Sequence, residues 1–379
     1  MPKIAIIGAG IGGLTTAIAL QQAGFEVEIY ERTPELKEVG AGLSLWPNAI
    51  KVLRQLGLGE ALESISVVAP VVGTRNPRGD ILAQLPSRVI EQRYGAAVCV
   101  VHRADLLALL AEALNGTPIQ LGWECTGFDQ DSDGITAHFA GEKTVRADAL
   151  IGADGINSAI RAQMFGSVPP RYSGYTAWRA ITTFPPANLP AGESWGCGSR
   201  FGLLPVDSKR VYWFATKNAP PNQPPQPNGH KPELLSIFKD WFDPIPTVIG
   251  ATPEESILRN DIVDRPPLDT WSQGRVTLLG DAAHAMTPNM GQGACQAIED
   301  GLVLARCLKA SSDIPLALQL YQTKRLNRAN KIVNTSHFIG TIGQLEKPLA
   351  CRLRNFVAKI TPASRQLQQI DWVAGYEIE

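Results

Sequence analysis

Four glycines near the N-terminus have the spacing of a phosphate-binding turn. The motif Gly8-Ala-Gly10-Ile-Gly-Gly13 follows the apolar segment Lys3-Ile-Ala-Ile-Ile7. In this context Gly8 permits a tight turn, Gly10 lets a pyrophosphate approach the backbone, and Gly13 lets the next helix pack on the strand. The free amides and dipole at the helix N-terminus also favour an anion. The motif therefore predicts a dinucleotide-binding turn.

A carboxylate stands where the ribose of such a dinucleotide would lie. Glu31 ends the strand-like segment Val27-Glu-Ile-Tyr30 and lies 18 residues beyond Gly13. A carboxylate there accepts hydrogen bonds from both ribose hydroxyls and disfavours a 2'-phosphate. The predicted dinucleotide is therefore FAD or NAD(H) rather than NADP(H). A glycine-rich turn without a ligand is the alternative, and the strand, helix and acid in register argue against it.

A second acid follows a buried strand near the C-terminal third of the chain. The segment Val276-Thr-Leu-Leu-Gly-Asp281 ends on Asp281, and Gly291 and Gly293 precede a predicted helix. An acid at the end of a strand in an α/β sheet faces the ligand crevice, so Asp281 can accept a hydrogen bond from a sugar alcohol. The two glycines would let amides at the helix start approach a ring edge. Capping of the following segment is the alternative role for Asp281.

These motifs resemble those of the FAD-dependent aromatic hydroxylase family, the single-component flavoprotein monooxygenases. This family contains para-hydroxybenzoate, salicylate and urate hydroxylases and is related to zeaxanthin epoxidase. The segment from Val276 to Gly293 resembles the family's Gly-Asp flavin motif. Asp148-Ala-Leu-Ile-Gly152-Ala-Asp154-Gly155 resembles its Asp-Gly motif, which is associated with both FAD and the nicotinamide reductant. The motifs occur in the family's order and cover most of the chain.

The resemblance implies roles for residues of all three motifs. Asp281 would bind the ribityl chain, and Arg103 would reach the pyrophosphate, with a surface ion pair as the alternative for Arg103. Arg32 matches the basic residue that commonly follows the ribose-binding acid, and His284 is expected to be structural rather than a base. The implied cofactor-binding residues are Gly8, Gly10, Gly13, Glu31, Arg32, Arg103, Asp154, Asp281, Pro288, Gly291 and Gly293.

The resemblance also implies a reaction. NADH or NADPH would act as a transient reductant of FAD, and a flavin C4a-hydroperoxide formed with O2 would hydroxylate a small aromatic substrate. Because the cofactor carries the difficult chemistry, no metal or nucleophile is needed. The six cysteines have no zinc-ligand spacing. The protein would exclude water and orient the substrate.

The β-rich region between the second and third motifs is expected to contact the substrate. Arg200 and Tyr212 occupy positions similar to substrate-contacting residues of bacterial urate hydroxylases in the family. A guanidinium could bind an anionic substrate bidentately, and a phenol could orient it. The alternatives are a surface ion pair for Arg200 and sheet core for Tyr212. Trp46, in a segment similar to the family loop near the flavin, fits the core equally well.

The helices and strands that the sequence pattern indicates around these residues predict an α/β fold. A Rossmann-like FAD-binding domain (1–70, 99–165 and 274–345) would hold an inserted, mostly antiparallel β-sheet substrate domain (71–98 and 166–273), followed by C-terminal helices (346–379). Period-3.6 patterns and turn signals predict the helices at 14–23, 47–63, 103–114, 233–241, 291–308 and 315–338, and Gly57 and Gly59 are expected to break the second of these. The proline-rich stretch 219–229 is expected to be a loop.

The amino-acid composition of the chain limits the kinds of partner that it can be expected to bind. With 35 basic and 36 acidic residues among 379, the net charge is −1, so nucleic acid is not an expected partner. Cysteines without pairing motifs fit the cytoplasm. The expected partners are a small-molecule substrate and O2, and the chain would be a monomer or homodimer. Residues 347–359 form a basic amphipathic pattern that fits either a helix docked on the FAD-binding domain or contact with a membrane surface.

Three other functions remain open on the same scaffold. The chain could be an epoxidase of an isoprenoid-type lipid or a non-oxygenating flavin oxidoreductase. A flavin-free binding protein is the non-enzyme alternative, against which the intact Asp281, Gly291 and Gly293 motif argues.

Overall fold

The computed structural model describes residues 1–36, 41–186, 189–224 and 226–378. Positions 37–40, 187–188, 225 and 379 lie within the predicted domain ranges, and 225 lies within the proline-rich stretch, but all of them fall outside the described residues. Among the described residues, no helix has both the length and the apolar character needed to cross a membrane.

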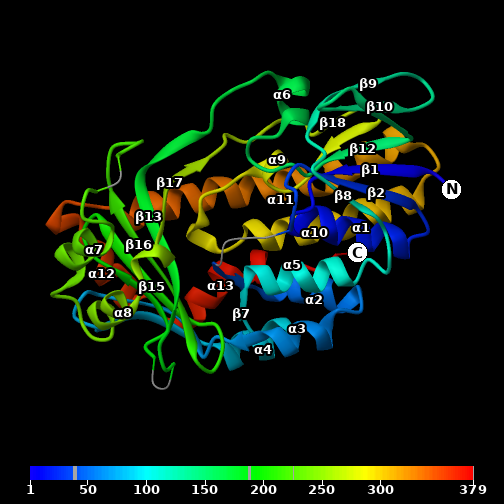
Figure 1. Cartoon of the computed structure of the whole chain (residues 1–379). Helices are drawn as coiled ribbons and strands as arrows, with labels where there is room; N and C mark the ends of the chain where they lie inside the picture. Colours follow the sequence, from blue (N-terminus) through cyan, green and yellow to red (C-terminus); the bar gives the residue numbers. More distant parts are fainter. Residues whose placement is uncertain (37–40, 187–188, 225, 379) are drawn as a thin grey trace.

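A six-stranded sheet carries the N-terminal half of the core (Figure 1). Its central strands β1, β12 and β19 are buried on both faces, as expected for parallel strands that are covered on both sides. β1 pairs in parallel with β2 and β12, and β12 with β19, so the carboxyl ends of β1, β12 and β19 meet at one edge. The order across the sheet is β18 (Ser272–Gln273), β19 (Val276–Leu278), β12 (Ala149–Gly152), β1 (Lys3–Ile7), β2 (Glu26–Glu31) and β8 (Ile119–Leu121).

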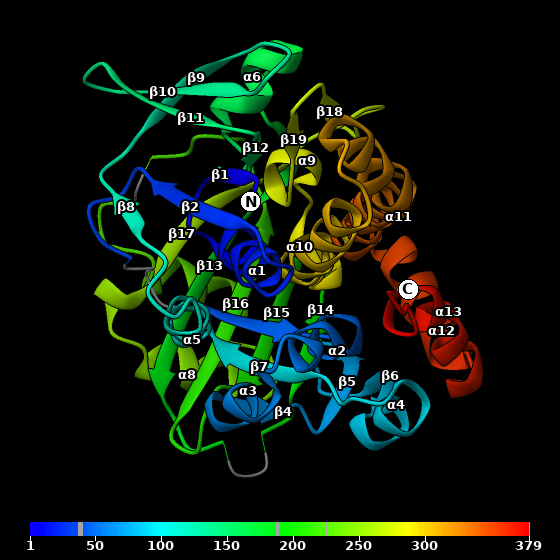
Figure 2. The same cartoon turned by 90° about the vertical axis from the view of Figure 1, so that its right-hand side faces the viewer.

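Helices cover one face of this sheet, and an antiparallel three-stranded meander covers the other (Figures 1 and 2). Two of the helices, α1 and α10, approach closely because Gly301 faces the backbone of Thr16, where a Cβ would lie 2.9 Å from the amide nitrogen. The elements are α1 (Ile11–Gln22), α5 (Arg103–Glu112), α10 (Gly293–Ala310), α11 (Ile314–Gly343), β9 (Cys125–Gln130), β10 (Ile135–Phe139) and β11 (Lys143–Ala147).

A second, seven-stranded sheet forms the other half of the molecule, on the left of Figure 1. Its pairings are antiparallel except for that between β14 and β5. Two helices and a 3-10 turn lie beside it: α7 (Lys231–Phe238), α8 (Ile245–Ala251) and η1 (Glu254–Ser256). The strand order is β17 (Leu258–Asp264), β13 (Arg171–Thr183), β16 (Arg210–Asn218), β15 (Ser199–Pro205), β14 (Gly192–Trp195), β5 (Val71–Arg75) and β6 (Ile81–Pro86).

The two faces of the seven-stranded sheet pack against different parts of the molecule. Because side chains alternate along a strand, Trp178, Phe201 and Trp213 point to one face and pack with the helices α7 and α8. The rings of Phe201 and Trp213 stack with centroids 5.5 Å apart. The neighbouring residues Arg200 and Tyr212 point to the opposite face, which meets the six-stranded half of the molecule.

Shorter elements connect the two halves, and two helices end the chain. Helix α12 packs on β6, on the turn between β14 and β15 and on the C-terminal end of α11 at Gly343, so it contacts both the predicted substrate domain and the predicted FAD-binding domain (Figure 2). The elements are β3 (Gly42–Leu45), β4 (Ser66–Val68), β7 (Cys99–His102), α2 (Pro47–Gln55), α3 (Gly59–Ile65), α4 (Ser87–Tyr94), α6 (Ala159–Phe165), α9 (Asp281–His284), η2 (Pro288–Met290), α12 (Pro348–Ile360) and α13 (Ala363–Ala374).

The predicted α/β fold class is confirmed, and the differences are local. The break expected at Gly57 and Gly59 within 47–63 is confirmed: this segment forms two helices, because the chain turns at Gly57, which has φ +80°. Residues 87–94, expected to be part of a β-rich stretch, form the helix α4, which buries Ile90 and Tyr94. A segment of eight residues is too short for the spacing of its apolar residues to distinguish a helix from a strand.

A buried cluster of charges joins α2, α10 and α11. The side chains of Glu299, Asp300 and Arg325 are fully buried. Arg325 Nε lies 2.7 Å from Asp300 Oδ1, its Nη1 pairs with Glu299, and Asn48 Nδ2 donates to Glu299 Oε1 at 2.6 Å. Burial raises the pKa of Glu299, but Arg325 and Arg328 outweigh it and hold the pKa below its usual value. Both carboxylates are therefore charged and fully compensated.

The same cluster holds the C-terminal segment. Arg328 Nη1 donates to the carbonyl oxygen of Trp372 at 2.6 Å, and its guanidinium lies 3.8 Å from the ring centroid of Tyr376. A cation at this distance from an aromatic face is attracted by the ring quadrupole. The end of the chain is thus fastened to the core of the six-stranded half.

We predict that Arg325→Ala lowers the free energy of unfolding by about 3–5 kcal/mol, because it leaves the buried Asp300 carboxylate without its guanidinium and leaves Glu299 with the guanidinium of Arg328 alone. Urea denaturation measures the loss. The adjacent exposed residue supplies the matched control, and Lys324→Ala should change stability by less than about 0.5 kcal/mol. Equal effects of the two substitutions would contradict the assignment.

Candidate functional site

The structure brings the three glycine and acid motifs to one edge of the six-stranded sheet. A Cβ on Gly8, which has φ +106°, would lie 2.4 Å from the carbonyl oxygen of Ala153, next to Asp154. A Cβ on Gly12 would lie 2.8 Å from a methyl carbon of Leu279, just before the third motif. The first turn therefore touches the segments of both other motifs, although they lie far apart in sequence.

The start of α1 can receive a phosphate. Gly10 is the N-cap of this helix, no described side chain caps it, and a Cβ there would meet no described atom within 4 Å. Free amides at a helix N-terminus form an anion site. Glu31 lies beside this turn, because its Oε2 accepts a hydrogen bond from the amide of Ala9 at 2.9 Å. Arg32 follows it and is exposed.

Asp154 has one oxygen in use and one that is free. Its Oδ2 accepts a hydrogen bond from the amide of Ala159 at 2.8 Å, at the start of α6. Its Oδ1 is buried and has no hydrogen-bond partner in the described ranges of the chain. Burial raises the pKa of this carboxyl. A buried acceptor without a partner is costly, so this oxygen indicates a ligand or a water.

The side chain of Asp281 points to solvent and makes no polar contact with the described part of the chain. It is the first residue of α9, directly after Gly280, and its side chain is exposed. Its carboxylate makes no hydrogen bond or ion pair within the part of the chain that the structure describes, so it does not cap the following segment. Both acids thus leave oxygens open to a ligand with hydroxyl groups.

Asp300 holds the segment that presents Asp281. Its Oδ2 accepts a hydrogen bond from the amide of Gly280 at 3.1 Å and lies 2.6 Å from His284 Nε2. Burial raises the pKa of Asp300, but His284 and Arg325 outweigh it and lower the pKa to about 2. His284 is buried and fixed by this contact, in agreement with the structural role expected for it. The buried charge cluster therefore reaches the third motif.

The start of α10 and the segment before it border the same edge. Gly293 begins α10, where no described side chain caps the helix and a Cβ would meet no described atom within 4 Å. Gly291 has φ +60° and faces the side chains of Ser44 and Trp46. Pro288 begins η2 and is exposed. The β3 segment and the helix start thus form two sides of one site.

Arg200 lies on the seven-stranded sheet and faces this site. It is 2% exposed, and its Nη1 lies 3.6 Å from the carboxylate of the partly exposed Glu193, so the ion pair given as the alternative forms, but with a buried guanidinium. Its Nε donates to Gln344 Oε1 at 2.9 Å, and its Nη2 donates to Asn289 Oδ1 at 2.7 Å. Asn289 belongs to η2, and Tyr175 also donates to its Oδ1, at 3.1 Å. Asn289 therefore connects the seven-stranded sheet to the segment that precedes α10.

Tyr212 combines a packed ring with an uncommitted hydroxyl. The ring is 8% exposed and lies against Gly42, where a Cβ would be 2.6 Å from the ring. Burial raises the pKa of Tyr212 to about 12, so the phenol stays neutral near pH 7. Its hydroxyl makes no hydrogen bond within the described residues. Tyr212 is thus part of the sheet core, and its hydroxyl can still contact a ligand.

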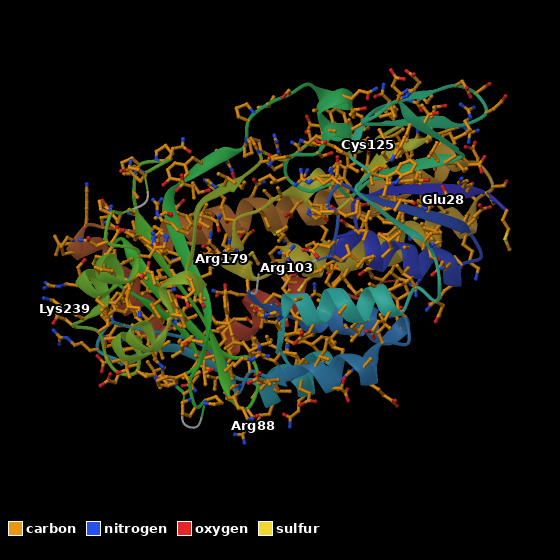
Figure 3. The ribbon with its side chains drawn as sticks, viewed as in Figure 1. Glu28, Arg88, Arg103, Cys125, Arg179 and Lys239 are labelled. Carbon is orange, nitrogen blue, oxygen red and sulfur yellow. The ribbon has the colours of Figure 1, made fainter. Side chains whose placement is uncertain are left out.

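Three residues of this site were not predicted from the sequence. Arg179 follows the alternation of Tyr175 on β13, and its Nη2 donates to Asn260 at 2.7 Å while its buried Nε has no partner in the described chain. Figure 3 shows Arg179 and Arg103 between the two halves of the molecule. Strand alternation could have indicated Arg179. No local signal marks Asn289 or Gln344, because their partners lie far away in sequence.

The site and fold define a dinucleotide-binding flavoprotein. A family model described as FAD binding domain matches residues 1–336, and the chain belongs to this family. It is 42% identical over 364 residues to the aurachin C monooxygenase/isomerase of Stigmatella aurantiaca, with 96% of this chain and 95% of the relative covered. It is 36% identical to the 6-hydroxynicotinate 3-monooxygenase of Pseudomonas fluorescens, with 92% and 94% covered.

A solved structure agrees with these relatives. The structure of HpxO from Klebsiella pneumoniae, complexed with FAD and uric acid, superposes with a TM-score of 0.92 at 31% identity and covers 97% of this chain and 95% of that one. The predicted family, cofactor and enzyme class are confirmed: the protein is an FAD-dependent monooxygenase. The open helix starts and the free oxygens of Asp154 and Asp281 fit FAD.

We predict that Asp281→Ala yields mostly apoprotein after purification. Losing a hydrogen bond between a charged carboxylate and a flavin hydroxyl should weaken FAD binding by about 1.5–3 kcal/mol. The ratio of flavin to protein absorbance measures retention. Asp269→Ala, which removes another exposed acid near the sheet, is the control and should keep its FAD. Full retention in both variants would remove Asp281 from the cofactor site.

Proposed function

We propose that the enzyme hydroxylates a small, anionic aromatic substrate, using NADH or NADPH and O2. The supporting observation is that a buried guanidinium, Arg200, and an uncommitted phenol, Tyr212, lie on the same face of the seven-stranded sheet, the face that meets the six-stranded half. Bound FAD would supply the oxygen chemistry. The residues of the chain would have to bind the substrate, orient it and exclude water.

Arg200 would hold the anionic group of the substrate. Its position is fixed by Gln344 and Asn289, and the Glu193 carboxylate lies 3.6 Å from its Nη1. A guanidinium fixed in this way loses little entropy when it binds a carboxylate or an enolate. Arg179, with a buried Nε that lacks a partner in the described chain, would add a second positive group on the same sheet face.

Tyr212 would orient the ring of the substrate. Its pKa of about 12 makes the phenol a neutral hydrogen-bond donor and not a base. Trp46, whose indole nitrogen approaches Gly291, would shield the ring from water on the side of β3. These apolar and polar groups match the composition of small-molecule sites, which are mostly apolar with a few placed polar groups.

The relatives support this substrate class. Their names specify 6-hydroxynicotinate, urate and 3-amino-4-hydroxybenzoate as the compounds on which they act. We extend to this chain the class that these compounds share, a small ring with an ionisable group. The particular ring remains to be identified by experiment.

We propose cofactor roles for the residues at the strand ends. Glu31 would hold the adenosine ribose, the Gly8–Gly13 turn and Arg103 the pyrophosphate, and Asp281 the ribityl chain. Arg32 would support the ribose site, and Asp154 would accept a hydrogen bond from FAD or the reductant. Pro288, Gly291 and Gly293 would line the isoalloxazine ring. Their positions along one sheet edge support this order.

We also propose the division of the chain into domains. Sheet membership supports an FAD-binding domain of 1–70, 99–165 and 274–345 and a substrate domain of 71–98 and 166–273, since β5 and β6 join the seven-stranded sheet. The C-terminal helices would begin at 346. A cytoplasmic location is supported by six cysteines that form no disulfide.

We predict that a subset of small hydroxylated or aminated aromatic acids stimulates NADH or NADPH oxidation by the purified holoenzyme. The measurement is oxygen consumption together with mass spectrometry of the product, which should gain one oxygen atom. Stimulated oxidation without an oxygenated product would indicate a flavin reductase instead. Epoxidation of an isoprenoid chain, with no turnover of any aromatic acid, would also overturn the proposal.

We predict that Arg200→Ala raises KM for the identified substrate by at least about tenfold, because a charge-assisted contact of about 1.5–3 kcal/mol is lost. Flavin content should change less than KM. Arg200→Lys keeps the charge and should restore part of the affinity. If Arg200 served only to hold the sheet on η2, both variants would lose FAD or thermal stability while KM stayed unchanged.

A further inference from the structure

The solvent-facing side of α12 is apolar. This helix carries five large hydrophobic residues that are half or more exposed, more than any other helix in the described part of the chain. At a spacing of three, four and seven residues they form one stripe along the helix. They are Leu349 (78% exposed), Leu353 (64%), Phe356 (60%), Val357 (50%) and Ile360 (59%). A contiguous exposed apolar patch of this kind marks an interaction surface.

Contacts on the protein side fix the orientation of this stripe. Arg354 is 8% exposed, and its two terminal nitrogens donate to the carbonyl oxygens of Gly196 at 2.8 Å and Gly343 at 3.0 Å. Cys351 is also buried, and its thiol donates to the carbonyl oxygen of Leu345 at 3.2 Å. The polar side of the helix therefore faces the protein. Turning the apolar stripe inward would break these contacts.

Positive charge accompanies the stripe. Lys347, Arg352 and Lys359 lie on α12 or at its start, Arg365 lies in the first turn of α13, and the sequence has no Asp or Glu from 347 to 370. The whole chain has a net charge of −1, so this surface is far more basic than the rest of the protein. A partner that fits both the apolar stripe and the positive charge has a negatively charged surface with an apolar layer beneath it.

We propose that α12 docks on the surface of an anionic lipid membrane, with its apolar stripe inserted at the boundary between headgroups and acyl chains. An amphipathic helix with a basic border binds such membranes by burying apolar area and by attraction to anionic lipids. This inference goes beyond the proposed reaction and does not depend on it, since it concerns where the protein binds.

A second copy of the chain fits this surface less well. A two-fold contact places the same patch on both sides. Arg352 and Lys359 of one protomer would then lie close to the same residues of its partner, and the described part of α12 offers no acid to compensate them. Anionic headgroups compensate these charges directly.

The membrane-facing helix lies close to the proposed substrate site. Arg354 binds the carbonyl of Gly343, and a Cβ on Gly343 would be 3.1 Å from the Arg200 side chain. One layer of residues therefore separates α12 from Arg200.

Co-sedimentation of the FAD-loaded protein with vesicles tests the proposal. The wild-type protein should bind vesicles of phosphatidylglycerol and phosphatidylcholine in equal parts and should bind pure phosphatidylcholine at least about tenfold more weakly. Leu353→Gln/Phe356→Gln should weaken binding to the mixed vesicles by about a hundredfold, since two large side chains no longer insert. Arg352→Gln/Lys359→Gln should weaken it by about tenfold and reduce its salt dependence.

A matched control separates insertion from general hydrophobicity. Leu316 and Leu320 are exposed on the first turns of α11, at the end of that helix far from α12, and Leu316→Gln/Leu320→Gln should bind vesicles as the wild type does. Flavin content and substrate-free NAD(P)H oxidation report whether each variant is folded. No binding by the wild type, or equal loss in the control, overturns the proposal. So does a wild-type dimer in sedimentation equilibrium that only Leu353→Gln/Phe356→Gln dissociates.

Discussion

The buried Asp300 carboxylate is the contact on which the site depends. It accepts hydrogen bonds from Gly280 and His284 on one side and from Arg325 on the other. A charge with no access to water is stable only when it is fully paired, so α10, α11 and the segment that presents Asp281 must keep one relative position. Arg328 extends the cluster to the C-terminal segment. The cofactor edge and the end of the chain are therefore parts of one packed unit.

The two halves of the molecule recognise their ligands by different means. The cofactor edge uses backbone: open helix starts at Gly10 and Gly293 and glycines that let segments approach closely. The seven-stranded sheet uses side chains, because alternation puts Arg200 and Tyr212 on one face and leaves the tryptophans on the other. Variation on one sheet face can therefore change the substrate while the cofactor edge stays the same, which fits the different compounds named for the relatives.

Local sequence patterns were sufficient to predict the dinucleotide-binding turn, because neighbouring residues set its geometry. Gly8, Gly10, Gly13 and Glu31 belong to one βαβ unit, whose geometry is set by neighbouring residues. Short elements were harder to predict from the sequence. Helix α4 was missed because eight residues carry little periodicity, and the contacts of α12 with the seven-stranded sheet were not predicted because amphipathicity shows that a helix has two sides but does not show which surface each side meets. Arg179 alternates with Tyr175 on β13, so strand alternation alone would have indicated it.

Residues a few positions apart were sufficient to predict the α/β class and the dinucleotide-binding turn, and the resemblance of the three motifs to the aromatic hydroxylases identified the dinucleotide as FAD. Only the tertiary structure decided that Arg200 is buried against Gln344 and Asn289, that the ring of Tyr212 packs on Gly42, and that α12 shows its apolar side to solvent. Those facts depend on contacts between segments as much as 170 residues apart, such as Gly42 and Tyr212. No local preference of the chain encodes such a contact, since the packing of the whole molecule selects it.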